Sequence, residues 1–393
     1  MTDALQAQKL QVPSHATLRE LERAWMAASG AADAGDLEID MSGSRLLEID
    51  GLAFLISKLV QRRRASLASH IRLPAERGAR SALRDWRFPE AVSDALSIAF
   101  HDMVTDDDRG YFGEPETPYS LAAWASPPVL PRNHFPFRTF FAASRDFGYT
   151  LAAEQAREWQ SSFVLSVLNR RLGGLGRRIS THVVHEAMMN AIRHPNAAIV
   201  QTVASHRTGD VDGPDRLSIL VWDDGVSIVD TLLNAQAQGH MLRPWQFPRL
   251  HRHYDVTVED ELSAATESLR VYSGDRPSLR RDLLLLSSTF PGITSDPDRP
   301  GRAHGEITDE DEVMGLPGMG LYVLANTVVD VFSGQLVIRT AELLLELGAS
   351  VTGRRTGTSP LLRARIVRYA PGGSYFTGNL LIANIPIARD PRP

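Results

Sequence analysis

Apolar residues between positions 36 and 90 recur first at strand spacing and then at helical spacing. In residues 37–41 they alternate with polar residues, as expected for a strand that buries one face. Apolar positions within 52–60 then recur every three or four residues, which indicates a helix, and the order repeats in 71–73 and 79–86. This strand, helix, strand, helix order predicts an α/β module with neighbouring strands.

A proline-rich stretch, residues 114–136, separates this module from the rest of the chain. Repeated proline disfavours both a helix and a central strand. A chain of 393 residues is also long enough to bury two ordinary cores. We therefore predict one domain over residues 1–115, a linker over 116–136 and a second domain over 137–393.

The second domain combines helices and strands with one long insertion, residues 229–314. A helical pattern is expected in its segment 258–290, whereas 291–311 is rich in proline, glycine and aspartate. Because long irregular segments in compact domains are usually functional or disordered, we interpret the insertion as a lid. The strands expected around it lie at 197–204, 217–222, 335–340 and 376–386.

Composition excludes several functional classes. Hydrophobic residues make up 43% and charged residues 23% of the chain, as in soluble globular proteins. The net charge of −5 gives no electrostatic footprint for nucleic acid. There is no cysteine for a disulfide or a thiol nucleophile, and no signal-like or bilayer-length apolar run. We therefore expect a cytoplasmic protein that binds neither nucleic acid nor membrane. The only lysines are Lys9 and Lys58, so no GxxxxGK phosphate loop exists.

Candidate chemistry begins on the expected helix 182–195. Glu186 and Asn190 are four residues apart and therefore lie on one helix face. The amide oxygen of asparagine is a neutral ligand suited to Mg²⁺, and a carboxylate one turn earlier can polarise an attacking water or hydroxyl. Arg193, on the same helix, can contact a phosphate through its planar guanidinium group.

A zinc site on the same helix is the competing interpretation. His182 and His194 share the face of Glu186 and Asn190 at a spacing of four. The sequence HVVHE is not the zinc motif HExxH, however, because its glutamate follows the second histidine. We therefore favour the magnesium interpretation.

Three further motifs follow in order along the chain. Asp223 and Gly225 come directly after an alternating strand pattern, where glycine allows a ligand close to the backbone. A glycine-rich turn at 315–321 then opens a helix, whose amino terminus favours phosphate. Its candidate residues are Gly318, Gly320 and Leu321. The segment GNLLIANIP, 378–386, contributes Asn379 and closes the series.

In this order the four motifs resemble the nucleotide site of the GHKL (Bergerat-fold) ATPases, which include histidine kinases and anti-sigma serine kinases. The resemblance implies an α/β sandwich whose mixed sheet is covered by helices on one face, with ATP and Mg²⁺ as ligands. It also implies that Asn190 chelates Mg²⁺, that Glu186 is the base in hydrolysing members, and that Asp223 accepts a hydrogen bond from adenine. The chain departs from the family pattern at Arg193, Leu316, Ser227 and Asn379, which replace lysine, glycine, glycine and threonine.

The first domain resembles STAS domains, the fold of anti-anti-sigma factors, over roughly residues 15–105. The resemblance rests on the pattern LEIDMSGSRLLEIDGLAFLISKLVQRRR. Such proteins usually carry a phosphorylatable serine just before the glycine that opens the first helix, and here Asp50 precedes Gly51. Asp50 is either a permanent negative charge at the helix start or a simple capping acid.

Three functions remain open from the sequence. The first is a regulatory kinase or phosphotransferase that acts on serine or threonine of a partner, the second an ATPase switch, and the third a nucleotide sensor without turnover. The motifs favour a GHKL-class ATPase or protein kinase that acts on a protein partner. The sequence leaves open whether the chain forms a homodimer.

Overall fold

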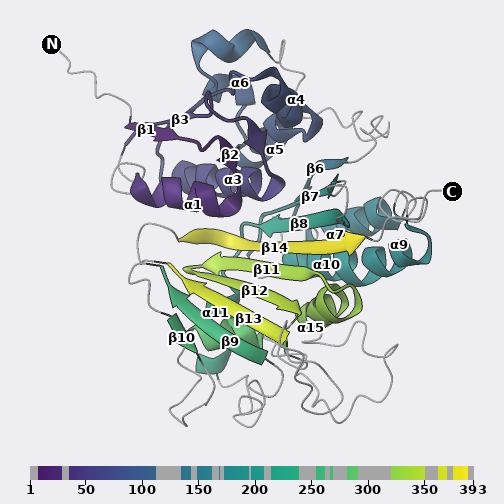
Figure 1. Ribbon diagram of the computed structural model, residues 1–393. Helices are drawn as coiled ribbons and strands as arrows, with labels where there is room; N and C mark the ends of the chain where they lie inside the picture. The colour runs from purple at the N-terminus through teal and green to yellow at the C-terminus, as the bar shows by residue number, and fades with distance from the viewer. Residues whose placement is uncertain are drawn as a thin grey trace. The chain divides into compact units, whose positions relative to one another are not determined.

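The computed structural model describes the chain in fourteen stretches (Figure 1). They divide into two compact units: Met1–Thr139 with Gln201–His206 and Pro371–Tyr375, and Phe140–Val200 with Arg207–Ala370 and Phe376–Pro393. The chain is thus a mixed α/β protein with a large mixed sheet. The described residues are 8–28, 35–111, 134–142, 148–161, 168, 172–193, 196–207, 214–238, 254–261, 266–268, 281–290, 320–349, 362–369 and 375–387.

The first unit contains the strands and helices expected between residues 36 and 90. Parallel strands lie in the order β1-β3-β5, and a two-stranded parallel sheet, β2-β4, accompanies them. The strands are β1 (Gln8–Gln11), β2 (His15–Ala16), β3 (Leu37–Asp40), β4 (Leu46–Leu47) and β5 (Ser69–Arg72). The helices are α1 (Leu18–Ala27), α3 (Ile49–Arg64), α4 (Arg77–Asp85), α5 (Phe88–Leu96) and α6 (Phe100–Met103), followed by the 3₁₀ helix η1 (Asp106–Tyr111).

Helix α1 was not expected from the apolar pattern, although its start carries a recognisable signal. Thr17 is the N-cap residue, and its Oγ1 accepts a hydrogen bond from the backbone N–H of Glu20 at 3.3 Å. The threonine and the glutamate three residues later form the sequence signature of a helix start. The helix packs on α3, where Trp25 meets Phe54 edge-on with ring centroids 6.1 Å apart.

Asp50 is the second residue of α3, whose N-cap residue is Glu48. Its Oδ1 accepts a hydrogen bond from the N–H of Gly51 at 2.8 Å, and its carboxyl also accepts one from the N–H of Leu18. Burial raises the pKa of this carboxyl above its ordinary value, and these backbone donors oppose the rise. Asp50 therefore connects the starts of two helices, which favours the capping interpretation.

The second unit contains most strands of a nine-stranded mixed sheet, whose order is β10-β9-β13-β12-β11-β14-β8-β7-β6. The pair β9 and β13 is parallel, whereas the pairs β11–β12, β11–β14, β12–β13 and β14–β8 are antiparallel. The strands are β6 (His134–Phe141), β7 (Ile199–Arg207), β8 (Asp215–Asp223), β9 (Tyr254–Asp260), β10 (Thr266–Ser268), β11 (Gln335–Ala341), β12 (Leu343–Ala349), β13 (Leu362–Arg368) and β14 (Phe376–Ile387).

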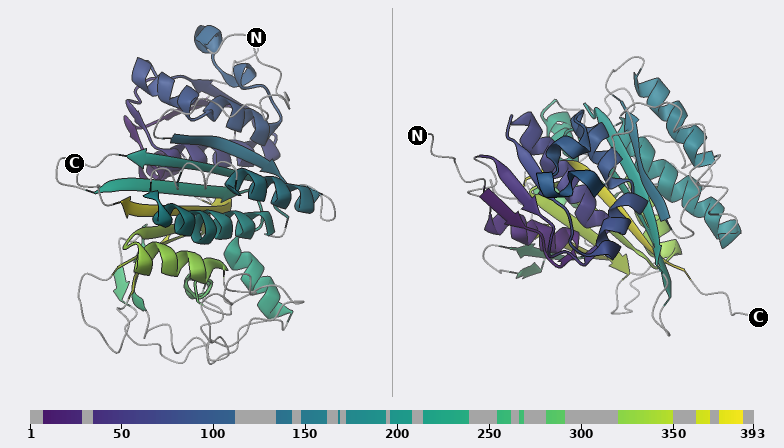
Figure 2. Two further views of the ribbon diagram at one scale, coloured as in Figure 1. Left: turned by 90° about the vertical axis from the view of Figure 1, so that its right-hand side faces the viewer. Right: turned by 90° about the horizontal axis from the view of Figure 1, so that it is seen from above.

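Helices pack on this sheet through their apolar faces. Helix α10 contacts β8, and α7 and α15 lie against α10 (Figure 2). Helix α11 contacts β11, and α13 contacts β12 and β13. The helices are α7 (Gly148–Trp159), α9 (Gly174–Arg178), α10 (His185–Arg193), α11 (Ile228–Ala237), α13 (Arg281–Ser287) and α15 (Gly320–Ala325), with π-helical turns η4 (Ile179–Val184) and η8 (Asn326–Val331).

The prediction of a helix over 258–290 is wrong for residues 258–260 and 266–268, which are strands. Strand β9 ends at Asp260, strand β10 follows, and only α13 is helical in this segment among the described residues. Tyr254, Val256 and Val258 are buried at every second position, which is strand periodicity. The proposed lid 229–314 therefore contributes two strands and two helices, α11 and α13, to the sheet and its covering layer.

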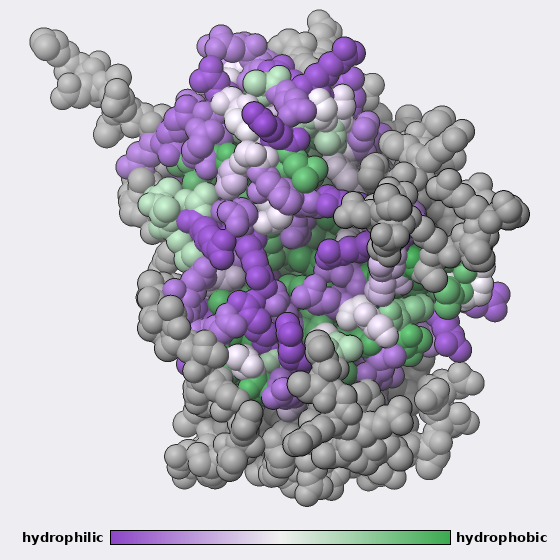
Figure 3. Space-filling model, in the orientation of Figure 1, coloured by the Kyte–Doolittle hydropathy of each residue, from purple (hydrophilic) through white to green (hydrophobic). Residues whose placement is uncertain are grey.

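Hydrophilic side chains predominate on the face drawn in Figure 3, with apolar ones in smaller groups between them. None of the helices in the described part of the chain has the length and apolar character needed to cross a membrane. The large apolar side chains that are exposed are scattered over separate elements: Leu46, Phe141, Leu175, Val331 and Tyr375.

We predict that Gly51→Ala destabilises the first unit. An added Cβ would lie 2.3 Å from the carbonyl oxygen of Ala16 and 2.9 Å from Leu21 Cδ1, and a backbone oxygen cannot move aside as a flexible side chain can. Overpacking of this kind costs about 1–3 kcal/mol of unfolding free energy, which urea denaturation measures. The control is Gly35→Ala, where the added Cβ has no neighbour within 4 Å. Equal stability of the two variants would contradict the prediction.

Candidate functional site

Three polar side chains lie side by side across the centre of the nine-stranded sheet. Thr340 on β11, Asn379 on β14 and Asp223 on β8 are partners in the strand register. All three are at most 2% exposed. Buried polar groups need hydrogen-bond partners, so this polar row must satisfy itself or a ligand.

The amide of Asn379 holds the polar row together. Its Oδ1 accepts hydrogen bonds from Thr340 Oγ1 at 2.7 Å and from the N–H of Ile228 at 2.8 Å. Its Nδ2 donates to Asp223 Oδ1 and Oδ2 at 3.1 and 3.2 Å, and to the carbonyl of Val226 at 3.1 Å. Only an amide offers two acceptor sites and two donors on one short side chain. Asn379 thus connects three strands to the loop that follows β8.

Asp223 is fully enclosed by protein. Its Oδ1 also accepts a hydrogen bond from the N–H of Gly225 at 2.9 Å, which turns the chain immediately after β8. Burial raises the pKa of Asp223 to about 8, against the lowering effect of the Gly225 and Asn379 hydrogen bonds. The neighbouring Asp224 binds the backbone N–H groups of Ala198 and Ile199 at 2.7 and 2.8 Å and so fixes the start of β7.

A glycine in β14 makes the close approach of Asp223 possible. Gly378 has a φ of +80°, and a Cβ at this position would lie 1.7 Å from the carbonyl oxygen of Asp223. Both features require glycine. The sequence GNLLIANIP does not indicate that its glycine lies against the backbone of Asp223.

Ser227 caps helix α11. Its Oγ accepts a hydrogen bond from the N–H of Asp230 at 3.0 Å and donates to Asp230 Oδ2. The sequence SIVD is a recognisable helix-start signature, which the comparison with a family glycine overlooked. The departure at Ser227 therefore has a structural reason: the residue fixes the first turn of α11 beside the polar row.

A second cluster lies where α10 meets α15. A Cβ added to Gly320 would lie 2.8 Å from Asn190 Oδ1, 2.9 Å from Asn190 Nδ2 and 3.1 Å from Glu186 Oε2. The two expected residues of α10 therefore share one face, as their spacing predicted, and that face packs against the first residue of α15. Any larger residue than glycine at position 320 would displace both side chains.

The amide of this cluster lacks a hydrogen-bond partner, and the pKa of its carboxyl group is raised. Nδ2 of Asn190 is buried and has no hydrogen-bond partner within the described residues. Burial raises the pKa of Glu186 above its ordinary value, and the charge of Arg193 opposes the rise. Since an unpaired buried amide costs free energy, the cluster is suited to a ligand that supplies the missing partner.

The structure describes some of the remaining expected site residues, and others lie outside the described residues. Gly225 and Leu321 are partly buried and Arg193 is exposed, whereas Gly318 lies outside the described residues. Of the zinc set, His194 is likewise outside them, and the described part of the chain holds no group of three histidine, aspartate or glutamate side chains that could bind a metal.

A closing lid can bring positive charge to a phosphate, and the candidate arginines of the segment 229–314 are Arg276, Arg280 and Arg281. Arg276 and Arg280 lie outside the described residues. Arg281 is bound on both sides, with its Nη1 2.6 Å from Asp230 Oδ1 and its other nitrogens on the carboxylate of Glu342. Arg281 therefore stabilises the packing of α13 on α11 and the β11–β12 connection.

Comparison with known proteins adds no relative: no family model, no curated protein and no solved structure matches the chain. The interpretation of the site consequently rests on its own geometry.

We predict that Asp223 makes stability fall as pH rises. Its folded-state pKa of about 8 lies above the ordinary 3.8, so the folded state holds a proton that the unfolded state releases. The stability from this group is complete below pH 3.8 and is lost as pH rises through about 8. The melting temperature of Asp223→Asn relative to wild type should therefore rise between these limits. Melting curves at several pH values measure it, and a constant difference would contradict the assignment.

Proposed function

We propose that the second unit binds Mg·ATP and acts as an ATPase or protein kinase of the GHKL class within a regulatory protein. The observation that carries the proposal is the Glu186–Asn190–Gly320 cluster, with its buried, unpartnered amide. The mixed sheet, with α10, α11 and α13 packed on it, supports the Bergerat-type α/β sandwich that the motifs imply. The parallel strands and helices of the first unit support its STAS-like assignment.

The residues of the cluster fit a magnesium nucleotide chemically. Asn190 would hold Mg²⁺ through its amide oxygen and offer its amide nitrogen to a phosphate oxygen. Glu186, with a raised pKa, would accept the proton of an attacking water or hydroxyl. Magnesium would supply charge neutralisation on the phosphates. Gly320 leaves the space in which these groups lie against each other.

The polar row fits recognition of the base. Asp223 would accept a hydrogen bond from the adenine amino group, and Gly225 would allow the ring close to the backbone. The amide of Asn379 contacts both carboxylate oxygens, so a bound base must share them with this amide. The contact helps to exclude other bases, because a site built around fixed hydrogen-bond partners leaves buried groups unpaired when the wrong base enters.

A nucleotide-dependent switch, or a sensor without turnover, is the second candidate. The observation that favours it concerns Arg281. This arginine forms ion pairs with Asp230 and Glu342 and therefore does not offer its charge to a phosphate. A switch needs only ligand-dependent contacts, whereas transfer of phosphate benefits from a free cation near the developing charge. In either function the STAS-like unit supports a protein partner of the anti-sigma type.

We predict a division of labour between the two residues of α10. Asn190→Ala should weaken Mg-dependent ATP binding, because the metal ligand is lost. Glu186→Gln should leave binding intact and slow turnover roughly 10²–10⁴-fold, as expected for loss of a general base. Calorimetry measures binding, and γ-labelled ATP distinguishes free phosphate from label on protein.

Two variants of matched type serve as controls. Asn326→Ala changes an asparagine in η8, and Glu154→Gln changes an exposed glutamate in α7; both should behave as wild type. Wild-type affinity in Asn190→Ala would contradict the magnesium site. Full turnover in Glu186→Gln would show that the base lies elsewhere, and binding without any turnover in the wild type would favour the sensor.

A further inference from the structure

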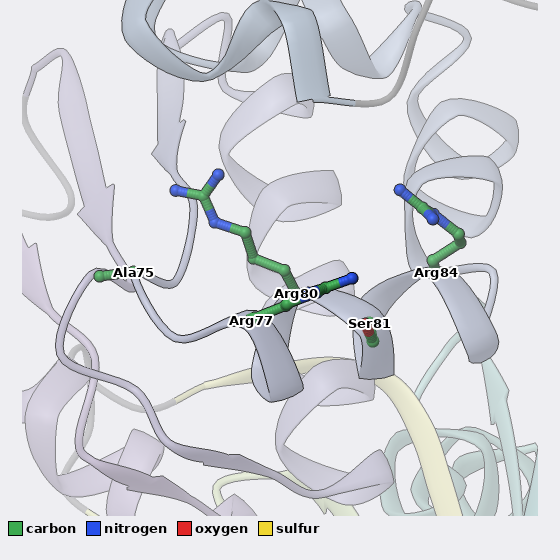
Figure 4. Close-up of a pocket in the computed structure, with 5 residues that line it drawn as sticks. All are labelled: Ala75, Arg77, Arg80, Ser81 and Arg84. Carbon is green, nitrogen blue, oxygen red and sulfur yellow. The ribbon is translucent and has the colours of Figure 1, made fainter.

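An open cavity of about 450 Å³ lies on the first unit, and none of its lining residues belongs to the sites discussed above. Figure 4 shows four of its lining residues on α4 and the fifth on the segment just before it. The helical residues are spaced by three, four and seven, so they occupy one face of α4. The lining consists of Ala75, Arg77, Arg80, Ser81 and Arg84.

Arg80 forms a fixed wall of this cavity. Its Nη2 lies 3.0 Å from Asp108 Oδ1, and its Nε donates to the carbonyl of Pro74. Asp108 is itself buried and accepts a hydrogen bond from the N–H of Leu73 at 2.9 Å. The carboxylate therefore balances the charge of Arg80 and fixes the orientation of its guanidinium group before any ligand arrives.

Arg77 and Arg84 are exposed on either side of Arg80. Within the described residues, no hydrogen bond or ion pair holds Arg77. Like charges three or four residues apart on a helix repel each other, so the positive charges of Arg77 and Arg84, on either side of the ion-paired Arg80, favour a bound anion. The nearby carboxylates are Asp108 on Arg80, Glu76 before the helix and Asp85 at its end.

The start of α4 adds to the positive potential. Glu76, the N-cap residue, makes no hydrogen bond from its side chain to the first turn. The first N–H groups of the nine-residue helix are thus left without a side-chain cap, beside Arg77 and close to the cavity. The partial positive charge of these N–H groups adds to the charge of the arginines, which remain the main source of positive potential.

We propose that this cavity binds a phosphate-bearing ligand through a phosphomonoester or pyrophosphate group. Guanidinium groups bind phosphate oxygens through paired, charge-assisted hydrogen bonds. The volume lies within the range of about 300–1,000 Å³ that is typical of small-ligand sites. Ala75 is the single apolar residue of the lining, and no aromatic side chain is present for a base to stack on. The recognised part is therefore the phosphate, and the site is independent of the Mg·ATP site proposed above.

The test is a calorimetric titration of the full chain with inorganic pyrophosphate at low ionic strength. The titration uses the Asn190→Ala variant, so that pyrophosphate binding at the proposed nucleotide site contributes least to the measured heat. Arg77→Gln and Arg84→Gln should each weaken binding about tenfold or more, because a hydrogen bond to a charged group contributes about 1.5–3 kcal/mol. Both side chains are exposed, so the variants are expected to fold, and circular dichroism checks this.

The matched control is Arg63→Gln, which removes an exposed arginine near the end of α3 outside the cavity. It should bind pyrophosphate like the parent. A second titration with an O-phosphoserine peptide distinguishes the sources: preference for pyrophosphate indicates a small molecule, and preference for the peptide indicates a phosphorylated protein. Absence of binding by both probes, or equal weakening in all three arginine variants, would overturn the proposal.

Discussion

The hydrogen bonds of one buried amide, that of Asn379, set the geometry of the second unit. This side chain accepts from Thr340 and Ile228 and donates to Asp223 and Val226. It thereby fixes β11, β14 and β8 at the same level and directs the chain after β8 into helix α11. Because Asp223, Thr340 and Ile228 are buried, removal of the amide would leave several polar groups without a partner at once, and each such loss costs about 1–3 kcal/mol.

Two glycines provide the complementary constraint. Gly378 lets β14 approach the backbone of Asp223, and Gly320 lets α15 approach Glu186 and Asn190. In both places a methyl group would occupy the position of atoms that the site needs. The amide of Asn379 and these two glycines thus define the surroundings of Asp223 on the sheet and of Asn190 on α10. Helix α10 itself packs on β8, the strand that ends in Asp223.

Local patterns in the sequence predicted those parts that depend on local chemistry. The alternation before Asp223 predicted β8, and the spacing of Glu186 and Asn190 predicted their common helix face. Strands β12 and β13 were not among the predicted strands. The apolar run LLLEL of β12 does not distinguish a strand from a buried helix. Their pairing depends on residues distant in the chain, as does that of β9 with β13.

The sequence predicted candidate positions but not the contacts that their side chains make. Nothing near Asn379 in the sequence indicates its contacts with Asp223 or Thr340, because these residues are 156 and 39 positions away. The role of Ser227 had a local signal, the serine and aspartate of SIVD, and was still missed because the position was compared with a glycine. The motifs predicted candidate residues, and the fold shows which of their atoms meet.

Hydrogen exchange of the full chain, with and without Mg²⁺ and a non-hydrolysable ATP analogue, tests the central claim most directly. The account predicts slower exchange in the loop 223–228 and in α10 around Asn190, since both would contact the nucleotide. Protection confined to other parts of the chain, or no change with the analogue at saturating concentration, would contradict the assignment of a nucleotide site to the polar row and the Glu186–Asn190–Gly320 cluster.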